Sequence, residues 1–79
     1  MVEGMKFNLY GYIADENDLA VGKYYYFYDD VYLYCGCIEP FANSHAFGCV
    51  GGTLYVNKPQ MKKLVEEKKV RIARLSKDN

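Results

Sequence analysis

The amino-acid sequence predicts a mainly β, α+β domain: a small five-stranded antiparallel sheet or barrel with one helix near residues 58–68. Four segments before residue 57 alternate apolar and polar residues or are rich in aromatic and β-branched residues, which is typical of strands. One later segment has a capping residue followed by apolar residues at helical spacing. A chain of 79 residues is the size of one domain, which we place at 1–79.

The first predicted strand spans residues 5–13, where apolar residues alternate with polar or tyrosine residues. It ends before the polar cluster at 15–18, which favours a loop. The second and third strands, residues 20–28 and 31–39, contain the most β-prone part of the chain, because aromatic and β-branched residues fill most of it.

The acidic pair at 29–30 predicts a hairpin turn between these two strands. A tight turn there pairs Tyr28 with Val31 and Tyr26 with Leu33. Both faces of the hairpin are then bulky, whereas a domain of this size has one core to offer. We therefore expect the core to cover one face and a second copy or a partner to cover the other.

Pro40 and the Asn-Ser pair at 43–44 predict the next turn. A fourth strand is expected at about residues 46–56. The glycines inside this segment predict a bulge or a bend, since glycine weakens a regular strand.

The helix follows directly. Asn57 is a suitable cap, Pro59 fits the first turn, and an apolar stripe begins at Met61. Residues 70–75 form the last predicted strand. The resulting order, β-β-β-β-α-β, resembles the element order of SH3-like small barrels, and this resemblance implies an SH3-like barrel as the closed form of the fold. Such barrels host many functions.

The predicted core follows from the apolar faces of these elements. We expect it to contain Phe7, Leu9, Ile13, Val21, Leu33, Ile38, Val50, Leu54, Met61, Leu64, Val65 and Ile72.

Charge is unevenly distributed although the net charge is zero. Residues 1–57 carry two basic and seven acidic side chains, a net charge of −5, and residues 58–79 carry eight basic and three acidic ones, a net charge of +5. The two parts can complement each other within one chain or between copies, and an acidic partner is the alternative. The sequence has no stretch approaching the roughly 20 apolar residues that a membrane-spanning helix needs, so no membrane span is expected. The odd count of three cysteines predicts a reducing, cytoplasmic location.

Three thiols and the only histidine lie within fifteen residues, in the pattern C-x-C-x7-H-x3-C. A small Cys3His zinc-binding domain using Cys35, Cys37, His45 and Cys49 is therefore one alternative. However, two cysteines two positions apart on a regular strand are too far apart to converge on one metal. We predict no cofactor and reduced, metal-free thiols that pack as small apolar side chains, with a Cys37–Cys49 disulfide as the remaining alternative.

An enzyme is not expected. Catalysis by a cysteine needs a base and an orienting group. His45 and a nearby carboxylate could fill these roles, but their spacing in the sequence matches no recognisable catalytic arrangement. The glycine-rich segment at 48–53 has no Gly-Lys-Ser/Thr and leads into a strand, so it is not a phosphate-binding loop.

The function predicted is a non-enzymatic protein-binding module, of an inhibitor or adaptor type or a homo-oligomer. Tyrosine suits interfaces because it offers a large amphipathic surface at low entropic cost. The predicted partner-binding residues are Tyr24, Tyr26, Tyr28, Tyr32 and Tyr34.

The alternative is a single-stranded nucleic-acid-binding small barrel, in which aromatic rings stack on bases while Lys69, Arg71 and Arg74 contact phosphates. Nucleic acid ranks second because Asp29 and Asp30 would repel phosphates beside the same aromatic rings.

Overall fold

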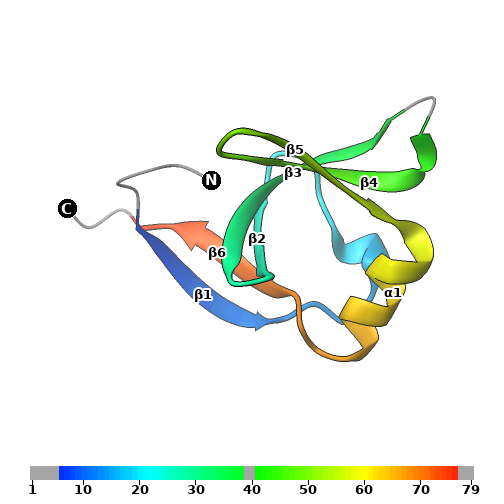
Figure 1. The fold of residues 1–79 in the computed structure, drawn as a ribbon. Helices are drawn as coiled ribbons and strands as arrows, with labels where there is room; N and C mark the ends of the chain where they lie inside the picture. The colour runs from blue at the N-terminus through cyan, green and yellow to red at the C-terminus, as the bar shows by residue number, and fades with distance from the viewer. Residues whose placement is uncertain (1–5, 39–40, 77–79) are drawn as a thin grey trace.

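The computed structural model describes residues 6–38 and 41–76. Its single α-helix and its strands follow one another along the chain as shown in Figure 1. In chain order the elements are β1 (Phe7–Tyr12), the short 3-10 helix η1 (Glu16–Asp18), β2 (Tyr24–Phe27), β3 (Asp30–Ile38), β4 (Phe41–Cys49), β5 (Gly52–Asn57), α1 (Lys58–Glu66) and β6 (Arg71–Leu75).

The strands form one antiparallel sheet in the order β1-β6-β2-β3-β4-β5. The mainly β class with one helix is confirmed. The prediction of five strands is corrected to six, and the SH3-like barrel is wrong because β1 and β5 remain at the two edges of an open sheet. Figure 1 shows how the sheet curves, with α1 on the side where β5 ends and β6 begins.

The sixth strand arises because the predicted fourth strand, 46–56, is a hairpin of two. Cys49 pairs with Gly52, so Val50 and Gly51 form a two-residue turn. Gly51 has a φ of 92°, a left-handed conformation that glycine adopts without steric cost. The turn predicted at 43–44 is also corrected, because both residues lie within β4. Pro40 lies outside the described residues.

The helix begins where the sequence predicted. The Asn57 side chain caps it by accepting a hydrogen bond from the Gln60 backbone N–H at 2.8 Å. The helix ends at Glu66, and Lys68 then adopts a φ of 57°, which turns the chain into β6. The helix packs against β4, β5 and η1. In the described part of the chain, no helix is long and apolar enough to cross a membrane.

The core confirms part of the prediction. Ile13 and the helical stripe of Met61, Leu64 and Val65 are buried. Five other predicted core residues are only partly buried: Phe7, Leu9, Leu33, Leu54 and Ile72. Val21 and Val50 are 70% and 63% exposed, because each lies in or beside a connection between strands. The Ile38 side chain lies outside the described residues.

Aromatic side chains fill much of the core, in place of the predicted core residues that are exposed or only partly buried. Tyr25, Phe27, Tyr32, Tyr34 and Phe47 are buried and belong to one cluster. The ring centroids of Phe27 lie 4.7 Å from Tyr32 and 4.9 Å from Phe47, distances that suit aromatic pairs. One face of the β2–β3 hairpin therefore forms much of the core, as expected for a hairpin that is bulky on both sides.

Candidate functional site

The turn of the tyrosine-rich hairpin lies one residue earlier than predicted. Tyr26 pairs with Val31 and Phe27 with Asp30, so the two turn residues are Tyr28 and Asp29. Both have left-handed backbone conformations, with φ of 51° and 59°. Two positive φ angles in a two-residue loop are the signature of a type I′ turn, whose twist matches that of the flanking strands.

The five predicted partner-binding tyrosines divide between the two faces. Tyr24 and Tyr26 are half-buried on the outer face, and Tyr28 is 52% exposed at the turn. Tyr32 and Tyr34 are corrected: both are buried in the core, because they alternate with the outward-facing residues of β3. The binding surface predicted from the sequence is therefore reduced to Tyr24, Tyr26 and Tyr28.

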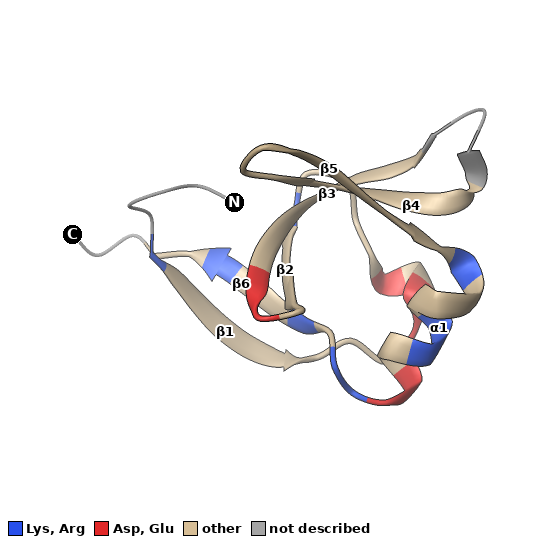
Figure 2. Ribbon diagram, viewed as in Figure 1, with Lys and Arg blue, Asp and Glu red and all other residues tan. Residues whose placement is uncertain are grey.

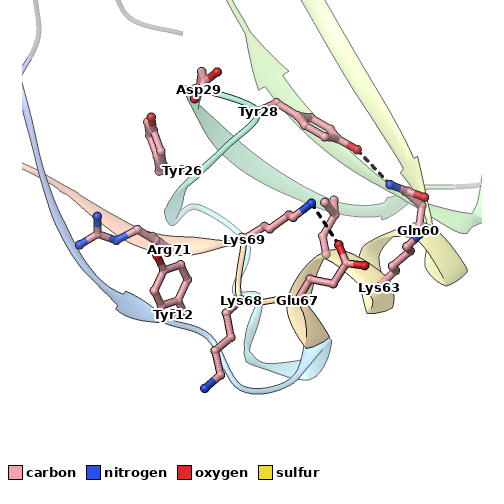
Figure 3. Close-up of a pocket in the computed structure, with 11 residues that line it drawn as sticks. Tyr12, Tyr26, Tyr28, Asp29, Gln60, Lys63, Glu67, Lys68, Lys69 and Arg71 are labelled. Atoms are coloured by element: carbon pink, nitrogen blue, oxygen red, sulfur yellow. Dashed lines mark hydrogen bonds and ion pairs between the residues drawn. The ribbon is translucent and has the colours of Figure 1, made fainter.

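A cleft of about 510 Å³ lies beside this turn, bounded by the C-terminal part of α1 and the start of β6 (Figure 3). The Tyr28 hydroxyl accepts a hydrogen bond from the Gln60 amide at 3.3 Å, which ties the turn to the helix. The rings that line the cleft are Tyr12, Tyr26 and Tyr28. Tyr12 was not among the predicted binding residues. Its place on β1 brings it to the cleft only through the β1–β6 pairing, in which Tyr12 lies opposite Arg71.

The cleft is also charged. Its basic side chains are Lys63, Lys68, Lys69 and Arg71, and its acidic ones are Asp29 and Glu67. Lys69 and Glu67 form an ion pair of 3.1 Å. Figure 2 shows the wider pattern, with acidic residues at the β2–β3 turn and on η1 and basic residues on β6 and along α1.

The three basic residues of the nucleic-acid alternative are not all at one place. Lys69 and Arg71 line the cleft, and the Arg71 guanidinium lies over the Tyr12 ring at 5.6 Å. Arg74 is not part of this lining. It lies over the Tyr10 ring at 5.3 Å, farther along β6.

The four alternative zinc ligands are not all brought together, because only Cys37 and His45 are neighbours. The β3–β4 pairing sets Cys37 opposite His45, whereas the Cys49 thiol contacts the Gly52 carbonyl and Cys35 is exposed. The three cysteines are free thiols, so the Cys37–Cys49 disulfide is wrong. Within residues 6–38 and 41–76, no three His, Cys, Asp or Glu side chains are arranged to hold a metal ion.

A β-bulge explains this arrangement. Tyr34 pairs with Phe47 and Gly36 with Ala46, so Cys35 is the extra residue in β3. Gly36 has a φ of 94°, which favours glycine. Because the extra residue reverses the alternation, Tyr34 and Cys37 share a face although three positions separate them.

His45 is buried at the centre of a polar cluster that the sequence did not predict. Its Nε2 lies 2.9 Å from Glu16 Oε2, and its Nδ1 lies 2.7 Å from the Tyr34 hydroxyl and 3.5 Å from Cys37 Sγ. Glu16 is held by η1, which Asp15 caps through a hydrogen bond from the Asn17 backbone N–H. The glycine at 36 inside a predicted strand was the available signal for the bulge that completes this cluster.

Burial and the neighbouring Cys37 raise the pKa of the Tyr34 hydroxyl above its ordinary value. Burial, together with the nearby Asp30 carboxylate, likewise raises the pKa of Tyr32. Both hydroxyls therefore keep their protons at neutral pH, and that of Tyr34 lies within hydrogen-bond distance of His45 Nδ1.

Comparison of this chain with models of known protein families, with curated proteins and with solved structures gives no match.

Proposed function

We propose that this protein is a non-enzymatic binding module that receives a segment of protein in the cleft beside the β2–β3 turn. The observation that carries the proposal is the conformation of Tyr28. A left-handed backbone costs a residue other than glycine or asparagine about 1–2 kcal/mol, and Asn-Gly is the usual sequence of such a turn. Here the turn holds a tyrosine with a φ of 51° and a ring that is 52% exposed.

Strained residues persist where the surrounding structure over-determines them, and they cluster at binding sites. A large apolar ring at the rim of a cleft is also a typical anchor of protein interfaces. The hydrogen bond from Gln60 fixes the Tyr28 ring before any partner arrives, which lowers the entropy lost on binding.

The charge of the cleft indicates the kind of segment that fits. Four basic side chains against two acidic ones favour an acidic segment, and the three tyrosine rings favour an aromatic or apolar side chain within it. A second copy of the chain is one such partner, since residues 1–57 carry a net charge of −5. A distinct acidic target, as for an inhibitor or adaptor, is the other.

Binding of single-stranded nucleic acid is the second candidate. The specific observation in its favour is that Tyr12 lies in the same cleft as Lys69 and Arg71, so a stacking ring and phosphate-binding cations are together. It ranks below protein because Asp29 lies at the rim and Glu67 already neutralises Lys69.

Selection of peptides from a random display library on the immobilised domain tests the proposal. We expect acidic peptides with an aromatic residue to be enriched. Sedimentation velocity of the domain alone tests whether a second copy is the partner.

Titration with oligo-dT at increasing salt tests the second candidate, whose affinity would fall steeply with salt. A monomeric domain that enriches no peptide but binds oligo-dT in this way would contradict the protein-binding proposal.

A further inference from the structure

A second, smaller cavity of about 280 Å³ lies away from the tyrosine-lined cleft, where β3, β4 and η1 meet. Four of the side chains in its wall are Glu16, Tyr34, Cys37 and His45. Cys37 is exposed, whereas the imidazole behind it is buried. A nucleophile accessible to solvent, a base and a carboxylate thus line one small cavity.

The order of these groups is carboxylate, imidazole, thiol. A carboxylate can only accept a hydrogen bond, so Nε2 of His45 carries the proton that it donates to Glu16 at 2.9 Å. When the ring is neutral, its lone pair is then on Nδ1, which faces Cys37 Sγ at 3.5 Å. In this tautomer the imidazole is set to take a proton from the thiol, with Glu16 holding its orientation.

Two donors compete for Nδ1, because the Tyr34 hydroxyl lies 2.7 Å from the same atom. Thiols are stronger acids than phenols, with ordinary pKa values of about 8.5 and about 10. Burial raises the pKa of Tyr34 further, so its hydroxyl keeps its proton. A proton transferred to His45 therefore comes from Cys37, and the Tyr34 hydroxyl, 4.0 Å from Sγ, is placed to donate to the resulting thiolate.

We propose that Cys37 is a covalent-modification site, in which His45 acts as the base and Glu16 as a positioning residue, for small α,β-unsaturated carbonyl compounds that enter this cavity. The Cys37 sulfur forms a bond to the β-carbon, and the carbon–carbon π bond breaks to give an enolate. The enolate then takes up the proton that His45 accepted from the thiol. The addition needs no oxidant, reductant or other reactant, and it goes beyond protein binding at the cleft.

The chain contains its own comparison thiol. Cys35 is also exposed on β3, but its sulfur contacts only the Leu33 carbonyl, at 3.5 Å, among the described hydrogen bonds. It therefore shares the strand, the exposure and the chemistry of Cys37 but not the imidazole. Cys49, half-buried beside the Gly52 carbonyl, is a second comparison.

The experiment measures acrylamide addition to the reduced, folded protein, with each cysteine quantified by peptide mass spectrometry over a range of pH. At about pH 6 we expect Cys37 to react about tenfold faster than Cys35, because His45 can accept the proton of the Cys37 thiol whereas the Cys35 thiol contacts only a backbone carbonyl. The advantage should shrink as the pH rises, because solvent base can then take the proton of either thiol.

Glu16→Gln and His45→Gln should each reduce the rate at Cys37 to that of Cys35 and remove the difference between their pH–rate profiles. Glu66→Gln, an exposed helical glutamate outside this cavity, should change neither rate. If circular dichroism shows that His45→Gln is unfolded, Glu16→Gln alone decides, since its amide oxygen can still accept the Nε2–H hydrogen bond while the negative charge that stabilises the protonated imidazole is lost. Equal rates at Cys37 and Cys35 in the natural protein, or an advantage of Cys37 that survives both substitutions, would overturn the proposal.

Discussion

His45 Nε2 lies 2.9 Å from Glu16 Oε2, and this contact joins β4 to η1 across 29 positions of the sequence. The imidazole is buried, whereas the Glu16 side chain is partly exposed. The connection between β1 and β2 is therefore tied to the sheet by a polar contact at a buried group, in addition to the packing of Leu19 on the core.

Replacing Glu16 with Ala should lower the free energy of unfolding by about 1–3 kcal/mol, because the buried Nε2–H is left without an acceptor. Urea denaturation followed by circular dichroism measures the change. Glu66→Ala is the matched control and should stay within about 0.5 kcal/mol, the usual range for an exposed side chain. Equal effects of the two substitutions would mean that water replaces Glu16 without loss.

Leu64 fixes the helix to the sheet. Its side chain is buried in the core cluster. Leu64→Ala should cost about 2–5 kcal/mol in the free energy of unfolding, since it removes apolar contacts and leaves a cavity. Lys62→Ala, on the exposed side of the same helix, is the control. A loss below about 0.5 kcal/mol for Leu64→Ala would show that α1 does not pack on the core.

Tyr34 should make stability depend on alkaline pH. Because its pKa in the folded state is raised above the unfolded value of 10.0, its contribution is complete below about pH 10 and is lost as the pH rises through the folded-state pKa. Above about pH 10 the free energy of unfolding should therefore fall less steeply with pH in Tyr34→Phe than in the natural protein, by up to about 1.4 kcal/mol per pH unit.

Chemical denaturation at several pH values between about 9 and about 12 measures this slope. Tyr28→Phe, at an exposed position, is the control. Tyr32, whose pKa burial also raises, titrates in both proteins and leaves a residual slope. Identical slopes for the natural protein and Tyr34→Phe would contradict the conclusion that folding raises the pKa of Tyr34.

The class of fold was predictable because alternation and capping are local signals. The hairpin register was not. Pairing Tyr28 with Val31 and pairing Tyr26 with Val31 place the same side chains on the same faces, so the apolar pattern cannot distinguish them. The actual register depends on two left-handed residues in a turn that lacks the usual Asn-Gly signal.

The division of the tyrosines was also beyond local pattern. Burying a tyrosine requires a partner for its hydroxyl. Tyr25 finds one in the Ala20 backbone N–H, at 2.8 Å, and Tyr34 finds one in His45. Ala20 lies in the connection that leads into β2 and His45 lies in β4, so Tyr34, which was predicted to bind a partner, instead fills the core.

Tyr28→Asn should separate stability from binding. Asparagine adopts the left-handed conformation more readily than tyrosine, which should stabilise the folded variant. Loss of the hydrogen bond to Gln60 should destabilise it. We expect the free energy of unfolding to stay equal or to rise by up to about 1 kcal/mol. Thermal and urea denaturation measure it, and a clear loss of stability would mean that the Tyr28 ring holds the fold together.

The most direct measurement of the central claim is the affinity of a selected acidic peptide for the natural protein, for Tyr28→Asn and for Tyr55→Asn, by isothermal titration calorimetry. Tyr28 and Tyr55 are 52% and 51% exposed, but Tyr55 lies on the edge strand β5 and does not line the cleft. We predict that Kd rises at least about tenfold for Tyr28→Asn, as for an interface anchor, and is unchanged for Tyr55→Asn. An unchanged Kd for a folded Tyr28→Asn would contradict the proposal that the cleft beside this turn binds the partner.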